Sequence, residues 1–208
     1  MDGLVSISLL RREIIIYSHF SGNSNFMGVR MGVENLNAMM DLGVKVDLES
    51  LHDYLGKERK HTIKRNSLKY QIPKPKASVE VFSSGKVVFT GLLTLGDMIT
   101  SKDAVLRDLE GAGMTLTESP NITITNIVAS GDLGLTLDLT SLYLKLGPSK
   151  AEYEPEQFPG LIYKLEDPTV TMLLFNNGKM ICTGTADAGE ASRAADIMYE
   201  KIKEIMKG

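Results

Sequence analysis

The chain has 208 residues, 43% of them apolar, and a formal net charge of −3, which suits one ordinary domain or two small ones with a buried core. The single cysteine, Cys182, excludes a disulfide framework and a cysteine-based zinc site, and three dispersed histidines argue against a histidine metal cluster. The negative charge, taken alone, argues against a protein that holds nucleic acid mainly by neutralising phosphates.

Residues 1–27 match no later part of the sequence, and we treat them as an N-terminal extension of unknown role. Their most apolar segment, residues 4–20, is interrupted by Arg11, Arg12 and Glu13, so it is too short and too charged to span a bilayer. It does not resemble a signal peptide either, because Asp2 stands where a basic start is expected. We therefore expect a cytoplasmic protein that does not associate with membranes.

The rest of the chain contains an internal duplication. Residues 33–56 and 124–147 are identical at 11 of 24 positions, and residues 68–91 and 161–184 are identical at 8 of 24. A period near 90 residues is too long for a solenoid repeat, which has roughly 20 to 50 residues. We predict two tandem pseudo-symmetric repeats, over residues 28–115 and 116–208.

Each repeat is predicted to begin with a strand, over residues 30–39 and 121–130. A helix follows over residues 47–54 and 138–145, because Asp47 and Asp138 can serve as N-caps. A further strand, a hairpin and a final helix complete each repeat, and we place the final helices over residues 102–110 and 188–206. Strands with helices on one face make an α+β fold.

Residues 153–184 give the clearest local signal. An Asn-Gly pair at Asn177-Gly178 lies between apolar segments and predicts a hairpin, preceded by a strand that ends at Asp167-Pro168. Strand alternation then defines two faces, one with Val170, Met172 and Leu174 and the other with Thr171, Leu173 and Phe175.

Both of these faces are apolar, which leaves two interpretations open. The second face is either covered by another layer or a dimer partner, or it is an open surface that binds something. Asn35 and Asn126 occupy matched positions in the first strands of the two repeats and favour the second interpretation. A homodimer through this face, in the absence of another ligand, stays open.

The stretch YEPEQFPGLIYKLEDPTVTMLLFNNGKMICTG, with the repeated segments NIVASGDLG and FSSGK, resembles the TATA-box-binding protein family, and in particular its short, acidic archaeal members. The resemblance extends from residue 33 to the last residue and is most specific in the second half. It implies a TATA-box-binding-protein-like saddle in which both repeats form one curved, ten-stranded antiparallel sheet. Four helices would lie on the convex face, and the concave face would lie in the DNA minor groove.

The resemblance implies a general transcription initiation factor that kinks A·T-rich double-stranded promoter DNA and recruits transcription factor B and, indirectly, RNA polymerase. In the family, two phenylalanines per half act as wedges, and Phe158 and Phe175 have the required spacing of 17 positions. The side-chain amides of Asn35 and Asn126 suit the acceptors that A·T and T·A pairs share in the minor groove. The DNA-binding residues implied are Asn35, Phe82, Lys86, Val88, Thr90, Asn126, Val128, Phe158, Lys164, Leu173, Phe175, Lys179, Ile181 and Thr183.

The first repeat departs from the family pattern. Arg65 stands at the position of Phe158, and Ile63 is an apolar substitute only after a slip of two residues. Glu80 replaces Leu173 and Asn37 replaces Val128, while Gln71, Leu93 and Ala186 occupy expected positions of phosphate-binding bases. We therefore expect weak or asymmetric DNA binding, with the second repeat forming the better groove surface.

Two loops at matched positions have opposite charge. Residues 57–76 contain eight Lys or Arg and one Glu, whereas the matching loop contains Glu152, Glu154 and Glu156. Both are solvated loops on the simplest interpretation. Alternatively, the basic loop reaches flanking phosphates, and the acidic loop, by resemblance, binds transcription factor B through Glu154, Glu156 and Gln157.

No Ser/His/Asp or Cys/His set occurs in a recognisable frame, so we expect no enzymatic activity, no metal site and no cofactor. A second hypothesis is a diverged paralogue that acts mainly as a protein-binding module for transcription factor B, with weak or altered DNA binding. The location would be the cytoplasm, at the nucleoid, in an archaeon, and the nucleus if the source is eukaryotic.

Overall fold

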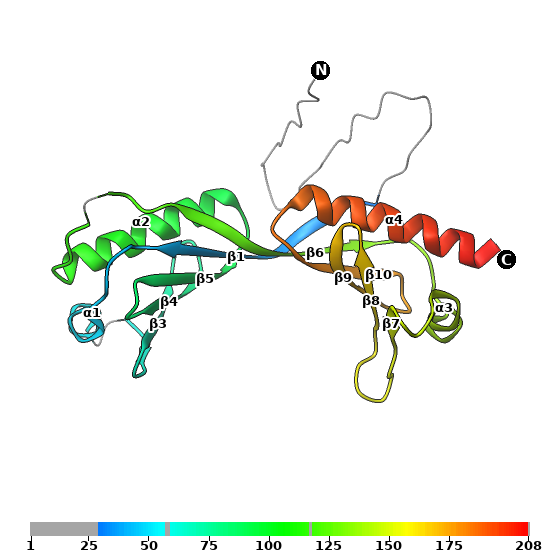
Figure 1. The fold of residues 1–208 in the computed structure, drawn as a ribbon, viewed down its shortest axis with the longest axis horizontal. Helices are drawn as coiled ribbons and strands as arrows, with labels where there is room; N and C mark the ends of the chain where they lie inside the picture. The colour runs from blue at the N-terminus through cyan, green and yellow to red at the C-terminus, as the bar shows by residue number, and fades with distance from the viewer. Residues whose placement is uncertain (1–28, 57–58, 117, 208) are drawn as a thin grey trace, which may run out of the picture. The chain divides into compact units, whose positions relative to one another are not determined.

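The computed structural model describes residues 29–56, 59–116 and 118–207, which contain ten strands and four helices (Figure 1). The elements occur twice in the same order, as the internal duplication predicts. The predicted extension over residues 1–27 lies outside the described residues. None of the described helices combines the length and the apolar character that a membrane-spanning helix needs.

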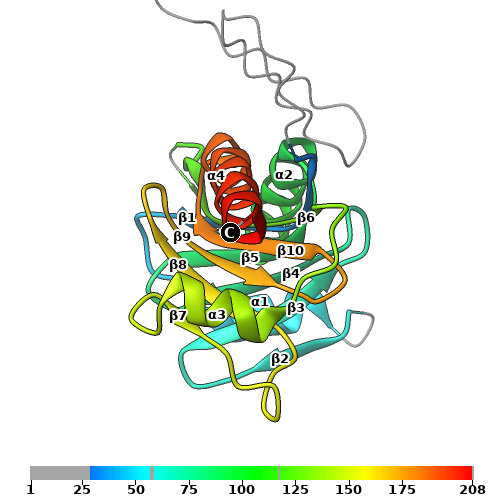
Figure 2. The same ribbon diagram turned by 90° about the vertical axis from the view of Figure 1, so that its right-hand side faces the viewer.

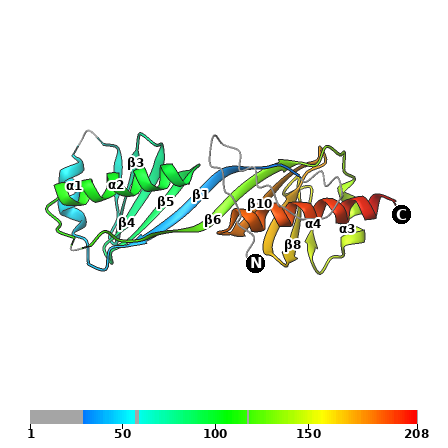
Figure 3. The same cartoon turned by 90° about the horizontal axis from the view of Figure 1, so that it is seen from above.

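The first half consists of five strands and two helices. They are β1 (Met31–Asp41), α1 (Leu48–Leu55), β2 (His61–Ile63), β3 (Ser67–Ile72), β4 (Ala77–Phe82), β5 (Lys86–Leu92) and α2 (Leu95–Gly111). The strands are antiparallel in the order β2-β3-β4-β5-β1. Seen from above, α2 runs across the strands of its own half (Figure 3).

The second half repeats this arrangement. Its elements are β6 (Ile122–Asp132), α3 (Leu139–Leu146), β7 (Ala151–Glu152), β8 (Leu161–Glu166), β9 (Thr169–Leu174), β10 (Lys179–Thr185) and α4 (Ala188–Lys207). The strand order is β6-β10-β9-β8-β7, again antiparallel. Helix α4 packs on β10, and α3 packs against β7 and α4 (Figure 2).

Most of the predicted elements agree with the structure, and local hydrogen bonds explain why. Asp47 and Asp138 cap α1 and α3, since each accepts a hydrogen bond from a backbone N–H of the first turn (3.1 Å). The predicted start of the first final helix was wrong, because α2 begins at Leu95. A capping box fixes that start: Asp97 N–H donates to Thr94 Oγ1, and Thr94 N–H donates to Asp97 (both 3.0 Å).

In each half the helices cover only one face of the strands. Alternate residues of β9 and β10, such as Met172, Leu174, Met180 and Cys182, are fully buried against the helices. The residues between them are only partly buried. Among the described residues no helix covers this second face, and a homodimer through it stays a prediction.

The chain folds as two compact units. One is Asn35–Thr125, and the described residues before Asn35 group with Asn126 onward, so the boundaries fall inside β1 and β6. The repeat limits at residues 28, 115, 116 and 208 stay a prediction from the duplication.

Candidate nucleic-acid interface

The second-half face that points away from α4 is built from apolar and hydroxyl side chains. Ile181 of β10 lies opposite Leu173 of β9, and Thr183 lies opposite Thr171. These four side chains and Val128 of β6 are all partly exposed. These five side chains expose methyl and hydroxyl groups, and none of them is charged. Such a surface suits contact with sugar and base edges.

Phe158 and Phe175 form a pair at one end of this face. Their ring centroids are 5.9 Å apart and their planes meet at 67°. The backbone positions both rings, since Phe158 N–H donates to Glu154 O (2.9 Å) and Phe175 N–H donates to Lys179 O (2.9 Å). An edge-to-face pair of this kind is favourable beyond its buried area. The two rings are thus held together before any ligand binds.

Gly160 makes this aromatic pair possible, although it was not among the predicted site residues. A Cβ atom at this position would lie 2.7 Å from a ring carbon of Phe158 and 3.0 Å from one of Phe175. The repeat alignment pairs Gly160 with Ser67, and this difference between the repeats was the available signal. A side chain at residue 160 would displace one of the two rings.

Asn126 is oriented by a β-bulge in β10. The strand pairing shifts register between Cys182 and Thr185, and Gly184 in the bulge has a φ of 101°, which favours glycine. Gly184 N–H donates to Asn126 Oδ1 (2.9 Å), so the amide oxygen is occupied. The amide nitrogen donates to Thr183 Oγ1 (3.2 Å) and has a second N–H group, which can serve a minor-groove acceptor.

The first half has the same backbone arrangement around Asn35. The register shifts between Leu36 and Ala38, and Gly91 N–H donates to Asn35 Oδ1 (2.9 Å). The side-chain amide nitrogen, however, donates to Asn37 Oδ1 (3.1 Å), where the second half has Val128. One donor of Asn35 is therefore used by a neighbouring polar side chain on the same strand.

Glu80 lies on the open face of the first half. It stands opposite Val88 of β5 and Lys69 of β3, and it accepts a hydrogen bond from Ser67 Oγ (2.9 Å). Its side chain is only partly buried. A carboxylate in this position repels the negative potential of a minor groove.

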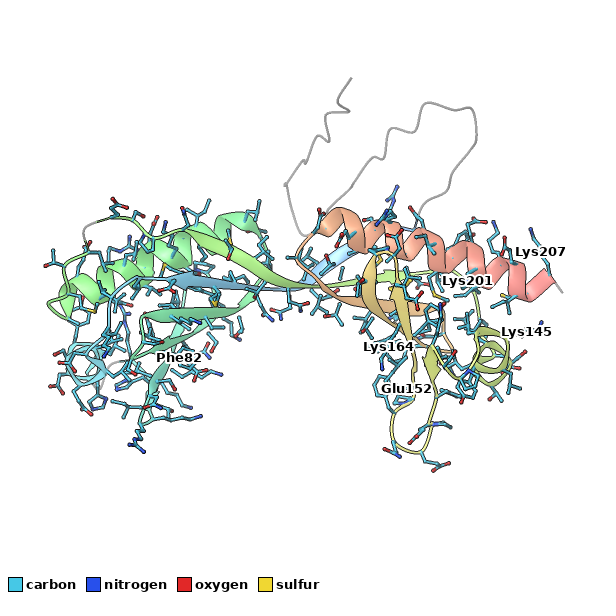
Figure 4. The ribbon with its side chains drawn as sticks, in the orientation of Figure 1. Phe82, Lys145, Glu152, Lys164, Lys201 and Lys207 are labelled. Atoms are coloured by element: carbon cyan, nitrogen blue, oxygen red, sulfur yellow. The ribbon has the colours of Figure 1, made fainter. Side chains whose placement is uncertain are left out.

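Among the described residues of the first half, no second aromatic ring pairs with Phe82, which is partly exposed (Figure 4). Arg65, at the position of Phe158, is exposed in the turn before β3. Ile63 is not a substitute, because it pairs with Leu68, whose side chain belongs to the helix-covered core. Of the remaining predicted residues, Thr90 lies opposite Ser78 and is partly exposed.

The predicted phosphate-binding lysines are exposed. Lys86 lies opposite Asp41 and Lys179 opposite Asp132, at matched ends of the two hairpins. Lys164 Nζ lies 2.9 Å from Glu152 Oε1, and both side chains are more than half exposed (Figure 4). Exposed pairs of this kind are weak, so a phosphate can compete for Lys164. The three substituted positions are also exposed or partly exposed, and they are Gln71, Leu93 and Ala186.

The predicted partner-binding residues gather at one exposed turn between β7 and β8. Glu154, Glu156 and Gln157 are all exposed. Gln157 donates to Glu154 through its backbone N–H (2.9 Å) and through its side-chain amide. These bonds hold the two residues at the tip, where a partner with basic side chains can reach them.

One polar cluster in the first half was not predicted. Tyr70 OH donates to the buried Asp108 carboxylate (3.0 Å), which also pairs with Arg59 Nη1 (2.5 Å). Burial, together with the Asp108 carboxylate, raises the pKa of the Tyr70 phenol above its ordinary value. Arg59 is thus one basic residue of segment 57–76 with a structural role. The prediction that this whole segment is a loop was wrong, because it contains β2 and β3. No group of three potential metal ligands occurs among the described residues.

Comparison with known proteins identifies relatives of this chain. A family model described as transcription factor TFIID, or TATA-binding protein, matches residues 30–111 and 121–205. TATA-box-binding protein D of Halobacterium salinarum is 36% identical over 173 residues, or 83% of this chain and 93% of the relative. The TATA-box-binding protein of Archaeoglobus fulgidus is 34% identical over 176 residues, or 85% of this chain and 96% of the relative.

The solved structure of the Methanococcus jannaschii TATA-binding protein superposes with a TM-score of 0.72 at 33% identity, over 84% of this chain and 98% of that one. The α+β arrangement of strands and helices described above is therefore the fold of these proteins. The family model covers both repeats, and the relatives are matched over nearly their whole length. The chain belongs to the TATA-box-binding protein family.

Proposed function

We propose that this protein is a general transcription initiation factor that binds the minor groove of the TATA box. The observation that supports this most directly is the Phe158–Phe175 pair beside an open face of methyl and hydroxyl groups. Apolar side chains of this kind unstack base steps and kink the duplex toward the major groove, and the TATA-box-binding protein is itself the standard example of this mode. The protein acts without a cofactor and is not an enzyme.

In this mechanism the protein distinguishes A·T from G·C pairs through contacts to the floor of the minor groove. The second N–H group of Asn126 pairs with the acceptors that A·T and T·A both offer, whereas G·C adds a donor that opposes it. Lys86, Lys164 and Lys179 add contacts to phosphates. This interface depends on apolar area and on a few donors, so a net charge of −3 is compatible with it.

The two loops orient the complex. The exposed turn with Glu154, Glu156 and Gln157 binds transcription factor B, through which RNA polymerase is recruited. The exposed basic side chains of segment 57–76 contact phosphates that flank the site. Opposite charges at matched positions favour one orientation of the complex over the other. The double variant Glu154→Arg/Glu156→Arg tests this, because it must abolish recruitment of transcription factor B while TATA binding persists. Normal recruitment would exclude the turn as the docking site.

A titration on two duplexes tests the DNA-binding role. The protein is added to a TATA duplex and to a G·C-scrambled duplex of equal length, at two salt concentrations, with and without transcription factor B. We expect specific TATA binding that persists at the higher salt concentration, because apolar contacts release no counterions. Equal binding to both duplexes would contradict the proposal.

A second candidate is a diverged paralogue that acts mainly as a protein-binding module. Glu80 on the open face and the lack of a described ring paired with Phe82 favour it. The same titration separates the two functions, since the module binds transcription factor B without DNA and shows no preference for the TATA duplex. The names of the archaeal relatives support a location at the nucleoid in the cytoplasm of an archaeon.

A further inference from the structure

A group of apolar and basic side chains, exposed except for the partly exposed Lys201, lies toward the ends of α3 and α4. We call it the C-terminal patch and define it by Leu144 and Lys145 of α3 with Lys201, Met206 and Lys207 of α4. Leu144 is 70% exposed and Met206 is 56% exposed, the highest values among the large apolar side chains of the described residues. Exposed apolar side chains beside one another commonly mark an interaction site.

One hydrogen bond holds the two helix ends together. Lys145 Nζ donates to the backbone carbonyl of Ile205 (2.9 Å), next to Met206. Figure 4 shows Lys145, Lys201 and Lys207 around this junction of α3 and the last turns of α4. Leu144 and Met206 are each adjacent in the chain to a residue of this bond, so both exposed apolar residues belong to the same helix junction as the lysines.

The patch has an excess of positive charge. Among the nearby residues of α4, Lys203 pairs with Glu200 at 3.5 Å, which leaves Glu204 as the neighbouring acid. Against this one acid stand the three lysines Lys145, Lys201 and Lys207. A ligand with negative charge is therefore favoured.

The internal duplication provides a control for the role of the patch in folding. The matched positions of the first half are occupied by Asp53, Tyr54, Asp108, Gly113 and Met114. There the counterpart of Lys201 is the buried Asp108, which is bonded to Tyr70 and Arg59. The same fold thus forms without lysines at these positions, so apart from the Lys145 bond to Ile205 the patch lysines are not required for the helix pair to form.

We propose that the C-terminal patch is a docking surface for an acidic, amphipathic peptide segment of another protein. Lysines at the rim attract carboxylates, while Leu144 and Met206 bury apolar side chains of the same segment, as in helix-in-groove recognition. A phosphate backbone does not offer such apolar groups. The patch is formed by the helices and not by the open sheet face, so it does not depend on the DNA-binding role.

A fluorescence anisotropy titration with designed peptides tests this. The probe is a labelled synthetic helix in which leucines lie on one face and glutamates on the other. Its control has serines in place of leucines and the same charge. We expect the leucine peptide to bind the full chain about tenfold more tightly than the serine peptide. Equal affinity would overturn the proposal, because any polyanion would then suffice.

Two double variants localise the binding. Each double variant must weaken binding of the leucine peptide about tenfold: one is Leu144→Ser/Met206→Ser and the other is Lys201→Glu/Lys207→Glu. Both leave Lys145 bonded to Ile205. The matched control on α2, Ile99→Ser/Lys102→Glu, also replaces an exposed apolar residue, 55% exposed, and a lysine. It must leave binding unchanged. Equal effects of the control and the patch variants would overturn the proposal.

Measurements on the unaltered protein distinguish other occupants and do not depend on the folding of the variants. Amide chemical shifts must change near Leu144 and Met206 when the leucine peptide is added, and changes confined to other regions would contradict the patch. Competition by a G·C duplex at equal concentration would indicate a nucleic-acid surface. Loss of peptide binding on concentration-dependent dimerisation, seen by sedimentation, would indicate a second copy of the chain. Either result replaces the proposal.

Discussion

The two halves of the chain share a backbone and differ in what their open faces can do. In each half an asparagine of the first strand accepts a hydrogen bond from the glycine of a β-bulge, at 2.9 Å in both. On this common frame the second half places paired phenylalanine rings and Val128, and the first half places Glu80 and Asn37. The core and the bulge are needed for folding, whereas the open face is free to vary because water can solvate either set of side chains.

The largest expected difference between the halves concerns the wedges. Phe175→Ala removes one ring of the pair at 5.9 Å and should weaken TATA binding by about 3 kcal/mol, or roughly 100-fold. Phe82→Ala, the matched change, should weaken it by less than about tenfold, since no described ring is paired with Phe82. Mobility-shift titrations measure both affinities. Equal losses would show that the two halves bind DNA equally.

The buried carboxylate of Asp108 in the first half should contribute more to the free energy of unfolding than Lys201, its counterpart in the second half. Asp108→Ala leaves the Tyr70 hydroxyl buried without its acceptor and should lower the free energy of unfolding by about 2 kcal/mol. Lys201→Ala, at the matched position, should change it by less than about 0.5 kcal/mol. Urea denaturation followed by circular dichroism measures both values. A small effect of Asp108→Ala would mean that water replaces the carboxylate.

Glu80 and Leu173 permit a reciprocal exchange. Glu80→Leu removes a carboxylate from the open face and should tighten TATA binding about tenfold, whereas Leu173→Glu should weaken it at least as much. Both are measured by mobility-shift titration at fixed salt. If Glu80→Leu has no effect, the first half does not approach the groove.

Asn37 should have a smaller effect. Asn37→Val removes the acceptor 3.1 Å from the amide nitrogen of Asn35, so that both of its N–H groups become available, and should improve discrimination between A·T and G·C pairs about threefold. Val128→Asn should reduce discrimination in the second half by a similar factor. Competition between duplexes that differ in one base pair measures this ratio. If this affinity ratio is unchanged in both variants, the asparagines do not contribute to base recognition.

The smallest effect concerns one matched pair of fully buried residues, Phe89 in the first half and Cys182 in the second. Burial raises the pKa of the Cys182 thiol to about 11, so the thiolate is scarce at neutral pH. We expect no reaction with a thiol reagent in the folded protein and full reaction in denaturant. Fast labelling without denaturant would show that β10 opens locally.

Local patterns were sufficient for much of the fold. Strand alternation correctly separated Met172 from Leu173, and the Asp47 and Asp138 caps located two helices, because each signal depends on neighbours within a few residues. The start of α2 was missed although Thr94 and Asp97 form a capping box. The edge strands β2 and β7 were missed because strands of two or three residues have too few positions to show a period.

Sequence alone determined the duplication and the α+β class, since these follow from identities between the repeats and from periodicity, and the resemblance of residues 153–184 indicated the family. It also identified the aromatic spacing of Phe158 and Phe175. Only the tertiary structure decided that Ile63 lies on the core face, that Gly160 leaves room for two rings, and that Asp108 is bonded to Tyr70 and Arg59. The reason is physical: these facts depend on strand register and on side-chain contacts between residues distant in the chain, for which no local pattern exists.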